Sequence, residues 1–381
     1  MDFSWSDQQL ALRERYARFA REQLNADVVA RDRNSIFSRE IWQKCADFGV
    51  LGLSVPAEYG GCAVDLLTAM LAMEGLGHGC LDNGLTFGLN AQLWTVQLPV
   101  ARFGTSQQKE RFLPALCSGR AIGAHAITEA EAGSDVFSLR TRADRCEGGY
   151  VLSGTKRLVT FAPVADLALV FATLDPGRGR WGITAFLVER GTPGFRATAA
   201  REKMGLRTVP IGELEFEECF VPESNRLGPE GAGASISNHS LEVERCCILA
   251  SQLGAMERQL ETAIAFARER RQFGQPIGKF QSVSNRIADM RLRLETSRLL
   301  LYKVAWLECM DKPAMLEAAL LKLHLSESFV ASGLDAIRIH GGTGYLTESG
   351  IERDLRDAVG GTLYAGTSDI QRNLIARLLG L

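Results

Sequence analysis

The sequence predicts a multidomain α+β protein in which a central β domain separates two helical regions. In residues 1–119, apolar side chains such as Leu10, Tyr16 and Phe19 recur at helical spacings. Between residues 120 and 228 the pattern changes to short apolar runs separated by Gly and Pro, which is typical of strands. From residue 240 the helical period returns in long segments that fit a helical bundle. A chain of 381 residues is long enough for three domains, which we expect at 1–119, 120–228 and 229–381.

The predicted elements follow these periods along the chain. In the first region, the Pro and Gly residues of 55–61 favour a turn between helices. In the second, apolar runs predict strands at 150–153, 167–174, 183–188 and 214–216. In the third, three long helices are expected at 241–271, 281–309 and 315–339, followed by a glycine-rich loop and a last helix at 369–379. Ser368 and Gln371 have the spacing of a capping box for that last helix.

Composition and charge exclude several classes of protein. Apolar residues make up 46% of the chain and charged residues 23%, as in ordinary globular proteins. A net charge of -2 gives no overall attraction to nucleic acid or to an anionic membrane. The nine cysteines are scattered and form no C-x-x-C pair or metal-ligand spacing, so we expect reduced thiols and no metal site. The acidic start and the lack of long apolar runs predict a cytoplasmic protein without a signal peptide or membrane span.

Three glycine-containing segments are candidates for binding an anionic or planar ligand. Residues 128–135 form a small polar loop in which Gly133 would allow close approach of a phosphate or ring, although an ordinary polar loop has the same composition. Residues 266–274 place Arg270 and Phe273 at a helix end, where they could meet a pyrophosphate and an adenine. Helix capping by the cations explains the same pattern. Residues 339–345 offer a further glycine-rich nest.

Two glutamates on one predicted helix compete for a catalytic role. Glu242 and Glu244 are two residues apart, which separates them by about 200° around a helix axis. At most one of them can therefore face a given site. Carboxylates on a helix surface are usually solvated, so the spacing alone leaves both roles open.

Taken together, these segments resemble the acyl-CoA dehydrogenase family along nearly the whole chain. The resemblance is carried by residues 49–53 with 59–61, by 104–134 and by the Arg-Arg-Gln-Phe-Gly and Tyr-Ala-Gly-Thr-Ser-Asp-Ile-Gln-Arg segments at 270–274 and 364–372. It implies an N-terminal all-α domain, a central β-barrel or β-sandwich domain and a C-terminal four-helix bundle, with FAD bound non-covalently between them. It also implies a homotetramer built as a dimer of dimers.

The resemblance assigns site residues by position. Ile127, Thr128, Gly133, Ser134 and Thr160 would contact the flavin and pyrophosphate, and the adenosine end, partly across a subunit interface, would be held by Arg270, Gln272, Phe273, Gln281, Arg338, Gly341 and Gly342. Thr367 and Asp369 would close the same pocket. The acyl substrate would contact Ser134, Arg245, Tyr364, Ala365 and Gly366.

The sequence departs from the family at the catalytic base. The usual base is the Glu of a Tyr-Glu-Gly-Thr motif, where this chain has Ala365. A branch that includes isovaleryl- and long-chain-type enzymes instead carries its Glu directly before an Arg on the first long helix of the C-terminal domain. That position is Glu244, followed by Arg245, so the resemblance implies that Glu244 removes the α-proton. Leu158 also stands where a Trp often flanks the flavin.

The sequence does not decide between alternative substrates or between alternative electron acceptors. The run 361–377 is also similar to dehydrogenases that act on acyl or prolyl groups tethered to carrier proteins, so the partner is either free CoA or a phosphopantetheine carrier protein. The acceptor is expected to be an electron-transfer flavoprotein or oxygen. The alternatives are a flavin oxidase or monooxygenase on the same fold and a non-catalytic family member.

Overall fold

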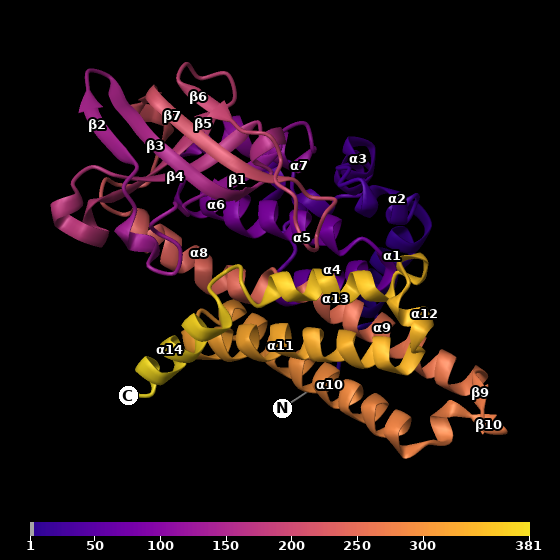
Figure 1. The fold of residues 1–381 in the computed structure, drawn as a ribbon. Helices are drawn as coiled ribbons and strands as arrows, with labels where there is room; N and C mark the ends of the chain where they lie inside the picture. Colours follow the sequence, from indigo (N-terminus) through magenta and orange to yellow (C-terminus); the bar gives the residue numbers. More distant parts are fainter. Residues whose placement is uncertain (1–3) are drawn as a thin grey trace.

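The computed structural model describes residues 4–381, apart from the side chains of Ser240 and Leu241. Figure 1 shows the β domain on one side of the molecule, the long C-terminal helices on the opposite side and N-terminal helices beside both. The N-terminal region consists of α1 (Asp7–Gln23), α2 (Val28–Arg33), α3 (Arg39–Asp47), α4 (Leu66–Gly79), α5 (Asn83–Ala91), a π-helical turn (Gln92–Gln97), α6 (Leu98–Phe103) and α7 (Ser106–Cys117).

The central region is one mixed sheet. Its strands are β1 (Gly123–Ala126), β2 (Arg142–Cys146), β3 (Gly149–Thr160), β4 (Leu167–Thr173), β5 (Ile183–Glu189), β6 (Phe195–Ala197), β7 (Ile211–Pro222) and β8 (Arg226–Leu227). They lie in the order β6-β7-β3-β2-β4-β5-β8, and β1 pairs in parallel with β4. The strands predicted at 167–174 and 183–188 are confirmed within one residue. The run at 214–216 is only the centre of β7, because this strand continues along β3.

Strand β3 contains a bulge close to its C-terminal end. The register of β3 against β7 shifts between Lys156 and Val159. Leu158, in the bulge, has a φ of 54°, in the left-handed region that is uncommon for a residue with a branched side chain. Its side chain is 68% exposed. The bulge therefore turns Leu158 out of the sheet while the neighbouring residues continue the strand.

The C-terminal region is a bundle of long helices. It contains α8 (Gly233–Cys247), α9 (Ala250–Glu269), a hairpin of β9 (Arg271–Gln272) and β10 (Gln275–Pro276), α10 (Gln281–Cys309), α11 (Met315–His340), α12 (Gly342–Tyr345), α13 (Ile351–Gly361) and α14 (Ser368–Leu378). The predicted helices at 281–309 and 315–339 are confirmed.

Three predictions in this region are wrong in detail. The helix expected at 241–271 begins earlier and is interrupted between Cys247 and Ala250, so it forms the two helices α8 and α9. Helix α13 occupies part of the expected glycine-rich loop, because its apolar face packs on α11 although its last residues are glycines. The N-cap of α14 is Thr367, whose hydroxyl accepts from the N–H of Ile370 at 3.2 Å, and not Ser368.

The two helical regions share one hydrophobic core. A Cβ on Gly77 of α4 would lie 1.9 Å from the carbonyl oxygen of Ser251, and a Cβ on Gly254 of α9 would lie 1.9 Å from that of Glu74. Only glycine allows the backbones of these helices to approach so closely. The Glu74 carboxylate, 1% exposed, also pairs with Arg298 of α10 at 2.9 Å.

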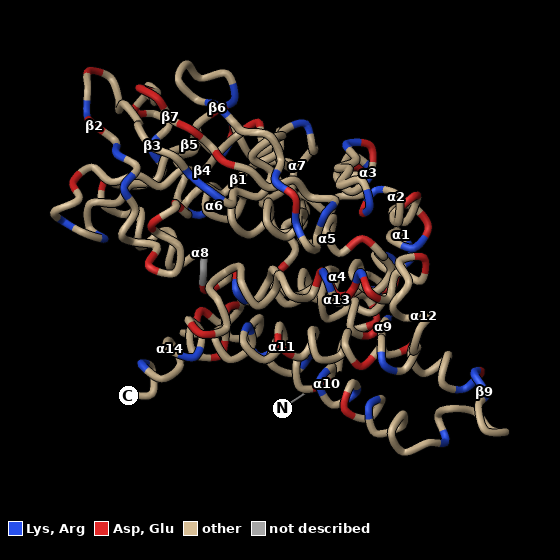
Figure 2. Tube along the Cα trace, in the orientation of Figure 1, with Lys and Arg blue, Asp and Glu red and all other residues tan. Residues whose placement is uncertain are grey.

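Charges of both signs are spread over all three regions (Figure 2). Within residues 4–381, no helix combines the length and the apolar character needed to cross a membrane.

Candidate active site

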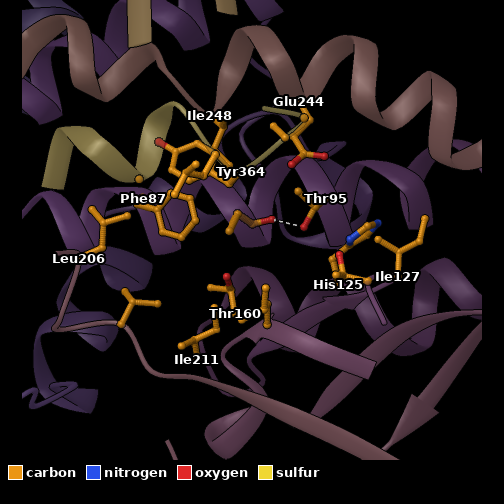
Figure 3. Close-up of a pocket in the computed structure, with 18 of the residues that line it drawn as sticks. Phe87, Thr95, His125, Ile127, Thr160, Leu206, Ile211, Glu244, Ile248 and Tyr364 are labelled. Carbon is orange, nitrogen blue, oxygen red and sulfur yellow. Dashed lines mark hydrogen bonds between the residues drawn. The ribbon is translucent and has the colours of Figure 1, made fainter. Parts of the chain in front are cut away.

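A cavity of ≈ 670 Å³ lies where the β domain meets the helical regions. Its walls come from α5 and the π-helical turn, from the loop after β1, from β3, from residues 203–211, from α8 and from the segment between α13 and α14. Figure 3 shows side chains from these separate segments converging on one space. The predicted site residues that line the cavity are Ile127, Thr128, Gly133, Ser134, Thr160, Glu244, Arg245, Tyr364, Ala365, Gly366 and Thr367.

Glu244 presents the acidic group of the cavity at the end of α8. Its carboxylate points into the cavity, towards Thr95 (Figure 3), although the residue is only 7% exposed. Burial raises the pKa of Glu244 to about 7, while the positive charges of Arg245 and Lys322 act in the opposite direction. A carboxyl group with a pKa near neutrality can accept a proton from a weakly acidic carbon at physiological pH.

Glu242 faces away from the cavity, as helical geometry requires. Its carboxylate accepts a hydrogen bond from the N–H of Ala314 at 3.1 Å, at the start of α11. Ala365 does line the cavity, but its methyl group cannot accept a proton. Its φ of 53° is in the left-handed region, so the loop that carries it is tightly turned. Glu244 is thus the glutamate of this pair that can act in the cavity.

The loop after β1 supplies polar groups that face the open space of the cavity. Thr128 and Ser134 line the cavity, and a Cβ built on Gly133 would meet nothing within 4 Å. Thr160, at the end of β3, contributes another hydroxyl to the cavity (Figure 3). Burial and the nearby Lys156 lower the pKa of His125 to about 4, so its imidazole is neutral at pH 7. A planar ligand with a polar edge, such as an isoalloxazine ring, fits this combination of open apolar space and hydroxyl groups.

The remaining predicted cofactor residues lie outside the cavity of this chain. The hairpin β9–β10, which carries Gln272 and is followed by Gln281, projects from the far end of the bundle (Figure 1). Phe273 at its tip is 94% exposed. The cavity lining also lacks Arg270, Arg338, Gly341, Gly342 and Asp369 among the residues that the structure describes. Arg338 pairs with Asp335 at 3.4 Å, and Asp369 pairs with Arg372 at 3.1 Å.

Sequence reasoning missed the apolar end of the cavity. Phe87 of α5 lies against Tyr364, with ring centroids 4.7 Å apart, and the Tyr364 hydroxyl accepts a hydrogen bond from Gln252. Leu206 and Ile248 complete this end (Figure 3). Tyr364 is one of the predicted substrate contacts, but no motif marks Phe87, Leu206 or Ile248, because an apolar side chain on a helix has the same pattern whether it faces a core or a ligand.

Comparison with known proteins gives consistent matches over the whole chain. The acyl-CoA dehydrogenase N-terminal, middle and C-terminal domain families match residues 6–120, 124–219 and 231–380. The chain is 44% identical to the L-prolyl-[peptidyl-carrier protein] dehydrogenase of Pseudomonas fluorescens, over 100% of both chains.

Solved structures agree with these matches. The prolyl acyl carrier protein oxidase AnaB superposes with a TM-score of 0.98 at 49% identity, covering 99% of this chain and 100% of that one. The FAD complex of PigA superposes with a TM-score of 0.97 at 42% identity, covering 100% of both chains. The predicted fold is confirmed, and a relative of this similarity binds FAD as the resemblance implies. The chain therefore belongs to the acyl-CoA dehydrogenase family of FAD-dependent oxidoreductases, which act on the CH–CH bond of thioesters.

Proposed function

We propose that this protein oxidises the α,β bond of an acyl thioester and that Glu244 is the base that removes the α-proton. The observation that carries this proposal is the buried Glu244 carboxylate facing the cavity, which Ala365, at the alternative base position, lines without an acidic group. Glu244 is held by a helix and is buried, and both features limit the directions that its side chain can take before the substrate binds.

Other residues of the chain would bind FAD, favour the ionised form of Glu244 and exclude water from the reaction. Thr128, Ser134 and Thr160 would hold FAD at the β-domain wall of the cavity. Bound FAD supplies the acceptor for the β-hydrogen and its electron pair. Arg245 and Lys322 favour the ionised form of Glu244, which must be a carboxylate before it can take the proton. The apolar side chains around Ile248 exclude water from the reacting carbons.

We infer that the substrate is a prolyl group carried on the phosphopantetheine arm of a carrier protein. The prolyl-carrier dehydrogenase named above is 44% identical to this chain, whereas the isovaleryl-CoA dehydrogenase of Solanum tuberosum is 39% identical. The cavity supports a compact acyl group, because the rings of Phe87 and Tyr364, tilted by 41° with centroids 4.7 Å apart, occupy its apolar end. A free acyl-CoA of similar acyl size is the alternative.

The proposal includes a homotetramer and the three-part division of the chain near residues 119 and 228. Phe273, with its ring exposed at the hairpin tip, suits a contact with the adenosine end of FAD in a partner subunit. On α10, Leu292, Leu299 and Trp306 are exposed at intervals of seven residues, which aligns them on one face of the helix.

The electron acceptor is an electron-transfer flavoprotein or oxygen, and the name of the relative AnaB is that of an oxidase.

Anaerobic titration of the yellow protein tests this function. Prolyl-carrier protein, prolyl-pantetheine and a series of acyl-CoA thioesters are added while the flavin absorbance is followed. We expect the prolyl thioesters to bleach the flavin. Glu244→Gln should keep FAD but lose about 10²-fold or more of the reduction rate. Glu242→Gln is the matched control, because Glu242 faces away from the cavity.

Three outcomes would contradict the proposal. A Glu244→Gln variant that reduces its flavin at the rate of the wild type would exclude Glu244 as the base. A flavin that no thioester bleaches would favour the non-catalytic alternative, and oxygen incorporated into the product would favour a monooxygenase.

A further inference from the structure

A buried ion pair lies behind the loop that faces the proposed flavin site. Lys156 of β3 is fully buried, and its Nζ is 2.6 Å from Oε1 of Glu129. The same Nζ donates a hydrogen bond to the carbonyl oxygen of Ile127 at 3.2 Å. The ammonium group therefore contacts the loop at its first residue and again two residues later, on either side of Thr128.

Glu129 extends this network to the segment just before β2. Its carboxylate accepts hydrogen bonds from the N–H of Arg140 at 2.6 Å and from the N–H of Thr141 at 2.9 Å. The Thr141 hydroxyl donates to the same carboxylate. With Lys156 included, the carboxylate has four donors, and these lower its pKa although its burial acts in the opposite direction.

The network has a further connection through the backbone. The N–H of Arg157, next to Lys156, donates to the carbonyl oxygen of Thr128 at 2.8 Å. Residues 127 and 128 are thereby attached to β3 by consecutive side-chain and main-chain bonds. Both residues also line the cavity, so their hydrogen bonds to β3 set the position of this part of the cavity wall.

Stability alone is a poor explanation for this pair. Removing two charges from water costs several kcal/mol each, and replacing a buried ion pair by apolar residues of similar volume is often neutral or stabilising. A buried lysine that binds a main-chain carbonyl does something that an apolar residue cannot do, because it fixes the direction of that peptide group. The peptide in question leads directly into Thr128.

We propose that Lys156 is a positioning residue for the flavin, because its ammonium group attaches the Ile127 carbonyl and the Glu129 carboxylate to β3 and so fixes the loop that carries Thr128 and Ser134. This inference rests on the proposed function, since it requires FAD in the cavity. Glu129 serves as the counter-charge that lets the ammonium group stay buried. Lys156 itself does not touch the cavity among the residues that the structure describes.

Three variants separate positioning from stability. Lys156→Met leaves the Glu129 carboxylate buried without its counter-charge, so we expect a lower melting temperature and weaker FAD binding. Glu129→Gln leaves the ammonium group uncompensated and should also lower the melting temperature. In the double variant both charges are absent, and the Gln oxygen can still accept from one of the N–H groups of Arg140 and Thr141, so stability should recover in part.

FAD release from the holoenzyme is the decisive measurement. Dilution of each holoenzyme, followed by the fluorescence of released FAD, gives the dissociation constant. The double variant should bind FAD about 10- to 100-fold more weakly than the wild type, because the contact with the Ile127 carbonyl is still missing. Arg31→Met is the control: Arg31 forms a buried ion pair with Asp82 and both residues are absent from the cavity lining, so we expect unchanged FAD affinity.

The His125 ring gives a second measurement. Its pKa, followed by NMR, should rise in the double variant because the positive charge of Lys156 is one cause of its low value. A double variant that binds FAD as tightly as the wild type would overturn the inference, whatever its stability. Lys156→Met with unchanged FAD affinity would overturn it as well. A wild-type protein that does not bind FAD would instead contradict the proposed function.

Discussion

Glu244→Gln should stabilise the protein above neutral pH while it abolishes flavin reduction. The carboxyl group is almost completely buried, and burial is the largest cause of its raised pKa of about 7, compared with an ordinary value of 4.5. The folded state therefore favours the protonated form. As the pH rises through this interval, the unfolded chain releases the proton first, and the folded protein becomes less stable relative to it.

The size of the effect follows from the two pKa values. A difference from 4.5 to about 7 corresponds to about 3 kcal/mol, at about 1.4 kcal/mol for each pH unit. This cost is nearly absent at pH 4, develops between pH 4.5 and 7 and is constant above pH 7. The neutral Gln side chain does not have this cost. Its amide N–H groups cost about 1 kcal/mol if they lack acceptors, but that cost is the same at every pH.

Urea unfolding from pH 5 to pH 8 measures this difference. Wild type and Glu244→Gln are unfolded at one protein concentration with excess FAD, because both oligomerisation and cofactor binding shift the apparent stability. The advantage of the variant should grow by about 2 kcal/mol between these pH values. Glu242→Gln should show no such growth. A constant difference across the range would refute the burial argument and, with it, the raised pKa.

Three further predictions follow from the cavity and from the hairpin. The rate of flavin reduction by substrate should rise with pH through a midpoint near the pKa of Glu244, about 7, and rapid mixing between pH 5.5 and 8.5 measures this midpoint. Phe273→Ala should weaken FAD binding about 5-fold without lowering the stability of the isolated subunit, because the ring is exposed in one chain and an aromatic stack contributes about 1 kcal/mol. Phe87→Ala should shift the ratio of kcat/KM values about 10-fold from prolyl towards longer acyl thioesters, because it lengthens the apolar end of the cavity.

Each of these has an outcome that would contradict it. A midpoint below pH 5.5 would mean that Glu244 is ionised throughout the working range. Unchanged FAD affinity in Phe273→Ala would place the adenosine away from the hairpin tip. A Phe87→Ala variant with wild-type preferences would show that another part of the cavity limits the acyl group.

The fold was predictable because its signals are local and repeated. The long helices at 281–309 and 315–339 have apolar residues at regular intervals over many turns, and the buried strands β4 and β5 are short apolar runs between turns. The interruption between α8 and α9 was not predictable. The residues on both sides of the interruption are apolar and buried. The helical periodicity of the sequence therefore continues through Ile248 and Leu249 although the helix does not.

The site was predictable only in part. Thr128, Gly133 and Ser134 lie in a motif, and the geometry of a helix excluded one of the two glutamates. Two features of the site depend on segments far apart in the sequence: the contact between Phe87 and Tyr364, and the attachment of the loop to β3 by Lys156. The sequence alone also does not show whether a lysine is buried or solvated. The pKa of Glu244 likewise depends on burial, which is a property of the assembled molecule.

The glycine contacts between α4 and α9 limit how the cavity can open. Backbones in contact at Gly77 and Gly254 cannot slide past each other without a steric clash, so the N-terminal and C-terminal helices behave as one rigid frame. A hinge between them would have to separate these closely packed backbones before a substrate could enter by that route. Glu244 and the ring of Phe87 both belong to this frame, so the distance between base and acyl pocket is preset. The other wall of the cavity includes residues 203–211, which do not belong to this frame, so a gate for the substrate would lie in that segment and not between the helices.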